Sequence, residues 1–158
     1  MQALLPQTAN AVAIRVFQIE SQAISALAEQ LDADFELAVR AILASSGRVI
    51  ICGMGKSGII GRKLAATLAS TGTPAFFMHP AEAFHGDLGM VTASDVFVAI
   101  SNSGSTKEVL KLLPFLKDNG NTLIAITGVP GSALAQAASF HLNVAVREEA
   151  CPLQLAPT

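Results

Sequence analysis

Two short stretches concentrate the side chains that could bind a ligand or move a proton. The stretch GMGKSG, residues 53–58, holds three glycines beside Lys56 and Ser57. The stretch SNSGST, residues 101–106, holds four hydroxyl side chains around Asn102 and Gly104. Glycine lets backbone N–H groups approach a ligand closely, and hydroxyl and ammonium groups add hydrogen-bond donors. Both stretches are therefore suited to binding an anion such as a phosphate group.

Each stretch follows an apolar run of the kind that forms a buried strand. Such runs occur at residues 48–52, 74–78, 95–100, 122–127 and 140–146, and helical segments are expected at 8–31, 34–44, 57–70, 81–84, 106–117 and 132–138. This alternation predicts an α/β fold, a three-layer α/β/α sandwich around a five-stranded parallel sheet. With strand order 2-1-3-4-5, the first and third strands are neighbours, and ligands bind beyond their carboxyl ends. The two stretches are therefore expected to meet there.

GMGKSG fits two nucleotide-binding motifs only in part. Residues 53–58 spell G-x-G-x-x-G, but the second strand ends in Phe-Met-His at residues 77–79, where a dinucleotide site needs an acidic residue. A P-loop needs a glycine where this chain has Ile50. Two interpretations stay open, an anion site at a helix N-terminus with Lys56, or a plain helix cap at Ser57.

SNSGST also allows two interpretations. Several neutral donors and a second helix N-terminus can hold a phosphate group without a metal. Alternatively, Ser105 and Glu108 have the spacing of a capping box, which would explain both residues structurally.

The motifs resemble those of a known family. The pattern S-x-S-G-x-T at residues 101–106 resembles the phosphosugar-binding signature of the sugar isomerase (SIS) domain. Residues 53–91, 99–109 and 149–158 together resemble the D-arabinose-5-phosphate isomerases. The resemblance, from about residue 47 onward, implies a flavodoxin-like SIS fold. It also implies cofactor-free interconversion of D-ribulose 5-phosphate and D-arabinose 5-phosphate, the first step toward the Kdo sugar of lipopolysaccharide or capsule.

The resemblance assigns roles to individual residues. Lys56, Glu108 and Glu149 match positions important to activity, and His85 is counted with them as a catalytic candidate. Glu149 is our first choice as the base that moves a proton through a cis-enediolate. Glu108 is the second choice, and Glu148 is expected to be a solvated neighbour. The expected phosphate-binding residues are Gly55, Ser57, Ser101, Asn102, Ser103, Ser105 and Thr106.

No metal or cofactor is expected. Residues 79–87 contain His79, Glu82, His85 and Asp87, but their spacing fits no familiar ligand set. The resemblance suggests that His85 faces the sugar instead. His141, in the last strand, is expected to be structural.

The composition limits the kinds of partner and the cellular compartment that this chain is expected to have. A net charge of −2 and the absence of a basic stripe speak against nucleic acid, and no apolar run is long enough to span a membrane. Cys52 and Cys151 form no metal or disulfide pattern, which favours a reducing cytoplasm. The 51% apolar composition favours a homo-oligomer, and the resemblance suggests a tetramer.

The organisation expected is a pair of N-terminal helices over residues 1–46, packed on the domain or on a partner subunit, and an SIS domain over residues 47–158. The apolar end CPLQLAPT looks like a cut, and the resemblance implies a helix with a catalytic histidine and a pair of CBS modules beyond it. A second function stays open, a regulatory domain that binds a phosphosugar without catalysis.

Overall fold

The computed structural model describes residues 8–153, and these divide into two compact units. We call Leu31–Ala145 the sheet unit. The described residues before and after it, 8–30 and 146–153, form the terminal unit. The family-like motifs at residues 53–91 and 99–109 both lie in the sheet unit, whereas Glu149 lies in the terminal unit.

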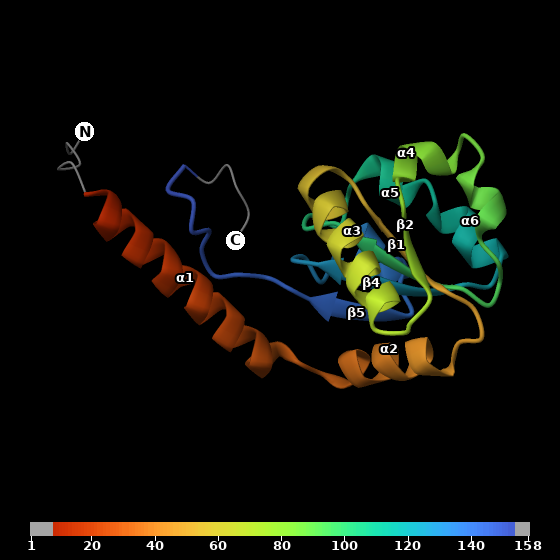
Figure 1. Ribbon diagram of the computed structural model, residues 1–158, viewed down its shortest axis with the longest axis horizontal. Coiled ribbons are helices and arrows are strands. Elements are labelled where there is room, and N and C mark those ends of the chain that lie inside the picture. Colours follow the sequence, from red (N-terminus) through yellow and green to blue (C-terminus); the bar gives the residue numbers. More distant parts are fainter. Residues whose placement is uncertain (1–7, 154–158) are drawn as a thin grey trace. The chain divides into compact units, whose positions relative to one another are not determined.

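The sheet unit is built on five parallel strands in the order β2-β1-β3-β4-β5, which confirms the predicted fold (Figure 1). The strands are β1 Val49–Gly53, β2 Ala75–Met78, β3 Val96–Ile100, β4 Thr122–Thr127 and β5 Phe140–Asn143. β1 lies between β2 and β3, with Cys52 opposite Met78 on one side and Ala99 on the other. β-branched and aromatic residues fill these central strands, as expected of strands buried on both faces.

Helices cover both faces of this sheet. Side chains alternate along each strand, so that Ile50 and Phe97 point to one face and Val49 and Ile51 to the other. The first face is covered by α4 Pro80–Ala83, the 3₁₀ helix η1 Asp87–Met90, α5 Lys107–Leu110, α6 Leu113–Asp118 and α7 Ala133–Ala137; the second is covered by α2 Ala33–Ala44 and α3 Gly55–Ser70. Each large side chain buried this way contributes about 1.5–3 kcal/mol.

Two elements differ from the sequence prediction. The helix expected over 106–117 is two helices, because Pro114 lies at the start of α6 and has no N–H to continue α5. The last strand is also shorter than the apolar run, ending at Asn143. On its outer edge the His141 N–H donates to the Asp34 carboxylate of α2 at 2.8 Å, which protects an edge that could otherwise pair with another chain.

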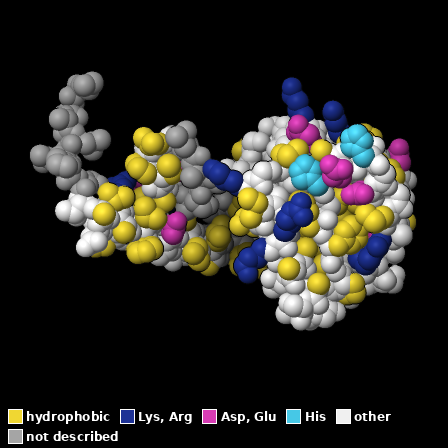
Figure 2. Space-filling view, turned by 45° about the horizontal axis from the view of Figure 1, so that its top comes forward, with side chains coloured by type: hydrophobic (Ala, Val, Ile, Leu, Met, Phe, Trp, Pro, Cys, Tyr) yellow, Lys and Arg dark blue, Asp and Glu magenta, His cyan; other side chains and the backbone are white. Residues whose placement is uncertain are grey.

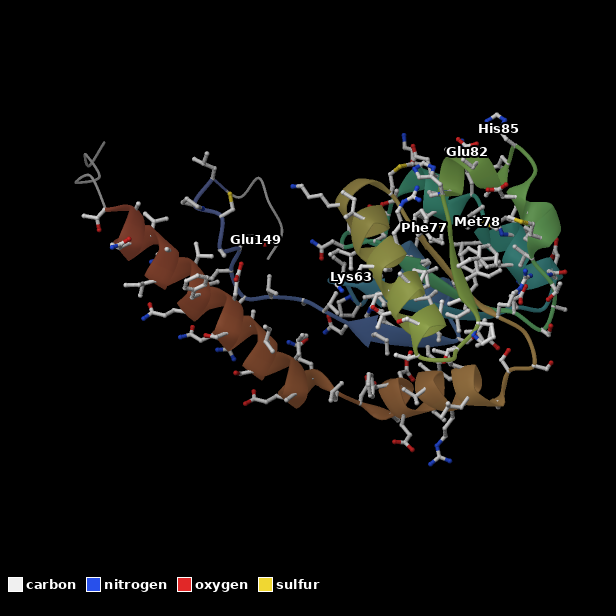
Figure 3. All side chains as sticks on the ribbon, viewed as in Figure 1. Lys63, Phe77, Met78, Glu82, His85 and Glu149 are labelled. Carbon is white, nitrogen blue, oxygen red and sulfur yellow. The ribbon has the colours of Figure 1, made fainter. Side chains whose placement is uncertain are left out.

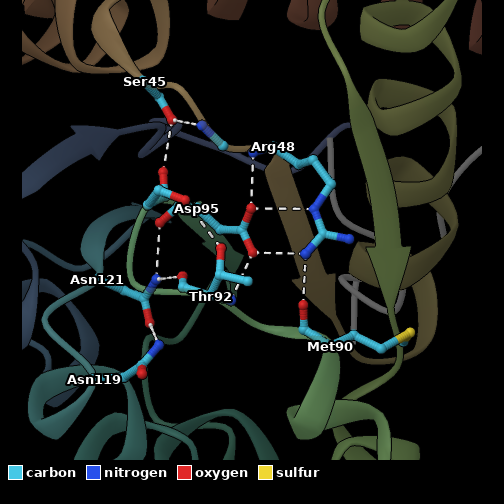
Figure 4. Close-up of polar contacts among 9 residues, drawn as sticks. Ser45, Arg48, Met90, Thr92, Asp95, Asn119 and Asn121 are labelled. Carbon is cyan, nitrogen blue, oxygen red and sulfur yellow. Dashed lines mark hydrogen bonds and ion pairs between the residues drawn. The ribbon is translucent and has the colours of Figure 1, made fainter.

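An ion pair between the half-buried Arg48 and the buried Asp95 lies just before β1 and β3, at the amino end of the sheet (Figure 4). Arg48 Nη2 lies 2.8 Å from Asp95 Oδ2, and the backbone N–H groups of Arg48 and Thr92 also donate to this carboxylate at 2.8 Å. The Asn121 amide donates to the carbonyls of Thr92 and Asp95. Burial opposes the charge of Asp95, but the hydrogen bonds from Arg48 and Thr92 outweigh it and hold the pKa of this carboxyl well below its ordinary range.

The terminal unit contains α1 Ala9–Gln30, a helix of 22 residues. Phe17 and Ile24 are exposed on it, whereas Ile19 is buried. Arg15 pairs with Glu148 at 3.4 Å, and both side chains are more than half exposed, as expected for the solvated neighbour of Glu149. Within residues 8–153, no helix combines the length and the apolar character that crossing a bilayer requires.

Candidate active site

The two ligand-binding stretches follow neighbouring strands at the carboxyl end of the sheet. β1 and β3 are paired in register up to Gly53 and Ile100, and GMGKSG and SNSGST continue from these residues. The chain leaves β1 toward α3 on one face and β3 toward α5 on the other (Figure 1). This divergence is the topological switch point where open α/β sheets bind ligands. The strand pairing thus places the starts of the two stretches side by side, as expected from the strand order.

The GMGKSG loop opens a long helix without a side-chain cap. α3 begins at Gly55, which has φ +57°, and its N-cap Met54 makes no side-chain hydrogen bond to the first turn. Ser57 lies inside that turn, so the interpretation of Ser57 as the helix cap is wrong. Backbone N–H groups at the start of α3, together with the exposed Lys56, leave positive electrostatic potential at this loop.

The SNSGST loop is closed by its own hydroxyl groups. Ser101 is 2% exposed, and its Oγ lies 2.8 Å from Thr106 Oγ1. Ser103 Oγ accepts hydrogen bonds from the Ser105 N–H at 3.3 Å and the Ser105 hydroxyl at 3.0 Å. Gly104 turns the loop with φ +59°. Ser103 and Ser105 are exposed, so their hydroxyl groups can reach a ligand.

The capping box expected at Ser105 and Glu108 does not form. α5 begins at Lys107 with Thr106 as its N-cap, and no side chain caps it. Ser105 is one residue too early, and its hydroxyl donates to Ser103 instead. Glu108 is exposed in the first turn of α5, so capping no longer explains its presence.

The remaining predicted residues lie on other segments. His85 is exposed just after α4, the helix that follows β2, and Glu82 is exposed on that helix (Figure 3). His79 caps α4, its Nδ1 accepting the Ala81 N–H at 3.3 Å. Among residues 8–153, no three histidine, cysteine or carboxylate side chains gather into a metal-binding group. Glu149 is half-buried within the terminal unit.

Charged and apolar side chains are mixed on the surface of the sheet unit (Figure 2). Cys52, next to the GMGKSG loop, is fully buried, and burial raises the pKa of its thiol to about 12. The thiol therefore stays protonated at neutral pH and is unsuited to nucleophilic chemistry.

Sequence reasoning missed one polar group behind the SNSGST loop. Thr127, at the end of β4, is fully buried, and its hydroxyl lies 2.8 Å from His141 Nε2. The interpretation of His141 as structural agrees with this contact. Thr127 has no sequence signal, because a threonine that ends an apolar strand is ordinary.

The profile of the SIS domain family matches residues 42–158, which is most of the chain. The chain belongs to the SIS domain family. Its match begins within α2 and includes both loops of the candidate site.

Relatives of this SIS domain agree with that assignment. The arabinose 5-phosphate isomerase KdsD of Pseudomonas aeruginosa is 56% identical over 144 residues, which are 91% of this chain and 44% of that protein. The protein of the same name from Francisella tularensis is 52% identical over 149 residues, 92% of this chain and 46% of that protein. The chain thus spans less than half the length of these curated relatives.

A solved structure is also similar to this SIS domain. The structure of an E. coli CFT073 protein in complex with arabinose 5-phosphate has a TM-score of 0.88 and 42% identity to this SIS domain, covering 97% of this chain and 82% of that one.

Proposed function

We propose that this SIS domain is the isomerase domain of an arabinose 5-phosphate isomerase, interconverting D-arabinose 5-phosphate and D-ribulose 5-phosphate without a cofactor. The observation that carries the proposal is the position of GMGKSG and SNSGST at the ends of the paired strands β1 and β3, in a chain 56% identical to the P. aeruginosa enzyme. The E. coli CFT073 relative that binds arabinose 5-phosphate supports the same substrate.

We assign the phosphate group to the SNSGST loop. Ser103 and Ser105 expose hydroxyl groups there, and Gly55, Ser57, Asn102, Thr106 and the buried Ser101 complete the proposed phosphate-binding set. These groups are neutral, so they can bind the phosphate dianion without a positively charged side chain. A cation is then available to act at the other end of the sugar, where the proton is transferred. Lys56, at the start of α3, supplies that cation.

Isomerisation moves one proton between two carbons. In the direction from aldose to ketose, a carboxylate removes the proton from C2, and the electron pair forms the C1–C2 double bond of an enediolate whose negative oxygen is on C1. The O2 proton then moves to the C1 oxygen, which becomes a hydroxyl group, and the protonated carboxyl returns its proton to C1, which leaves a carbonyl at C2. We assign the base to Glu149, with Glu108 as second choice, and the stabilisation of the enediolate oxygen to Lys56. His85 is assigned to the sugar hydroxyl groups.

The cellular setting is part of the proposal. An arabinose 5-phosphate isomerase of the KdsD type supplies the first step toward Kdo, and a cytoplasmic location suits a phosphosugar substrate. We further propose a homo-oligomer, most simply a tetramer. Ile59, Ile60 and Leu64 are exposed on α3 beside the proposed site, and such apolar side chains suit a subunit interface.

The test is isomerisation in deuterium oxide. The 158-residue chain is mixed with D-ribulose 5-phosphate, and NMR follows the formation of D-arabinose 5-phosphate and deuterium uptake at C1 and C2. Glu149→Gln and Lys56→Met are expected to lower turnover at least about 100-fold, since each removes a group acting in the transition state. Glu148→Gln and Lys63→Met are matched controls, because Glu148 is exposed beside Glu149 and Lys63 is exposed on α3 (Figure 3).

Three outcomes distinguish the alternatives. Conversion with deuterium uptake supports the proposal, and unchanged conversion by Glu149→Gln overturns the role of that residue. Binding of the phosphosugar without any turnover, both in this chain and in the same chain extended to the full length of its relatives, would favour a regulatory domain instead.

A further inference from the structure

The connection between β4 and α7, residues 128–132, lies directly against the SNSGST loop. The Gly128 N–H donates to the Asn102 carbonyl at 2.9 Å, and the Leu134 N–H donates to the Gly104 carbonyl at 3.1 Å. These two backbone bonds, one from the connection and one from the first turn of α7, add to the bonds within the loop itself.

The β4–α7 connection and the SNSGST loop are tightly packed against each other. A Cβ atom on Gly104 would collide with the Ser132 side chain, and one on Gly128 would lie 2.5 Å from Asn102 Oδ1. Ser132 is itself held in place, because it is buried and its Oγ accepts the Ala135 N–H at 3.3 Å as the cap of α7. A shift of the connection must therefore move the loop as well.

Thr127 fixes the start of the connection. Its hydroxyl donates to the Val129 carbonyl at 3.2 Å, accepts from the Val129 N–H at 3.1 Å and lies 2.8 Å from His141 Nε2. A hydroxyl has a single proton, so with that proton on the Val129 carbonyl the third bond requires His141 Nε2–H as the donor. Thr127 is fully buried, and these three bonds use its whole hydrogen-bonding capacity.

We propose that Thr127 and His141 are positioning residues for the phosphosugar. His141 bonds to Thr127, Thr127 bonds to Val129 of the β4–α7 connection, the connection sets the SNSGST loop, and the loop binds the phosphate group. This inference rests on the proposed function. It requires that substrate affinity depend on a buried hydroxyl that does not belong to the loop itself.

The test compares three threonine variants of the 158-residue chain. Thr127→Val removes the hydroxyl at nearly constant volume, Thr127→Ser restores it, and Thr122→Val makes the same change at the other end of β4. We expect Thr127→Val to weaken arabinose 5-phosphate binding about tenfold in an NMR titration, since hydrogen bonds to a charged group depend on donor placement. Thr127→Ser and Thr122→Val are expected to bind like the unchanged chain.

A second readout follows the loop without any ligand. Amide hydrogen exchange at Gly104 is expected to accelerate in Thr127→Val and to recover in Thr127→Ser. His141→Phe keeps a ring and removes only one of the three bonds, so it serves if Thr127→Val does not fold. It is expected to weaken binding about threefold, on the scale of one hydrogen bond.

The two proposals fail in different ways. If the unchanged chain does not bind arabinose 5-phosphate, the proposed function is overturned. Amide hydrogen exchange at Gly104 still tests whether Thr127 and His141 position the SNSGST loop. If the variants lose thermal stability while affinity and Gly104 exchange stay at the values of the unchanged chain, Thr127 and His141 are only structural and the inference is overturned.

Discussion

The two ends of the central strands β1 and β3 are built from opposite kinds of polar group. At the amino end, the Asp95 side chain is 0% exposed, and its carboxylate accepts hydrogen bonds from both Arg48 and Thr92. At the carboxyl end, Ser103 and Ser105 are exposed, and α3 starts without a side-chain cap. At the amino end the hydrogen bonds surround a buried carboxylate, whereas at the carboxyl end the hydroxyl groups of Ser103 and Ser105 remain exposed to solvent.

This difference assigns stability to the amino end of β1 and β3 and ligand binding to their carboxyl end. A buried carboxylate is retained only when its hydrogen bonds compensate the cost of burial, so the amino end resists change. Outward-facing hydroxyl groups lose little on folding and remain available to a phosphate group. Substitutions at the amino end should therefore change the free energy of unfolding, and those at the carboxyl end should change affinity.

The largest effect is expected from Asp95→Asn. The substitution turns an acceptor into a donor against Arg48 and Thr92, which should lower the free energy of unfolding by about 3 kcal/mol. Urea denaturation measures this loss. Glu36→Gln is the control, because Glu36 pairs with Arg40 at the surface and such a pair contributes only about 0.5 kcal/mol. Equal losses in the two variants would contradict the contrast between an ion pair with a buried carboxylate and one in which both partners are exposed.

Gly104→Ala is expected to have the next largest effect and to change both quantities. The new Cβ meets Ser132 and forces alanine into φ +59°, which should cost about 2 kcal/mol of stability. Affinity for arabinose 5-phosphate should fall about tenfold or more as the loop shifts. Gly131→Ala is the control, since open space surrounds that position. A variant that lost stability but bound normally would show that the loop tolerates displacement.

The amino end also predicts a dependence of stability on pH. The pKa of Asp95 is lower in the folded chain than its ordinary value, so the folded state takes up this proton later than the unfolded state. The stabilisation is complete above the unfolded pKa of about 4 and is lost as the pH falls below it. The stability difference between the unchanged chain and Asp95→Asn should thus shrink by about 1 kcal/mol from pH 7 to pH 3. A constant difference in denaturation series at both pH values would argue against a depressed pKa.

Ser103→Ala is expected to have the smallest effect on stability. Its hydroxyl is exposed, so the free energy of unfolding should change by less than about 0.5 kcal/mol. Affinity for arabinose 5-phosphate should fall about tenfold, because a hydrogen bond to a charged group is lost. Ser46→Ala is the control, because Ser46 is exposed near the amino end of the sheet and takes no part in the hydrogen bonds of Asp95, so neither stability nor affinity should change. If the two serine variants bound equally well, the contrast between the two ends would not hold for binding.

Local patterns were enough for the architecture. The β-branched runs predicted all five strands, because strands buried on both faces leave a continuous apolar signal. The strand order, which the apolar runs do not encode, is that of the flavodoxin-like SIS fold expected from the family resemblance. The prediction of one helix over 106–117 was wrong, because Pro114 interrupts the backbone hydrogen bonds of the helix although the apolar spacing continues past it. The predictions of helix caps at Ser57 and Ser105 were wrong, because α3 and α5 begin at other residues. The exact residue at which a helix begins is hard to predict from local sequence.

The sequence by itself determined that this chain forms a parallel α/β sheet and that two donor-rich loops follow its first and third strands. Both conclusions depend on residue types and short spacings, which are local. Only the tertiary structure decided that Asp95 pairs with Arg48, that Ser132 sits beneath Gly104 and that His141 reaches Thr127. Each of these contacts joins residues more than ten positions apart, and polar side chains so separated carry no periodic signal until the strands bring them together.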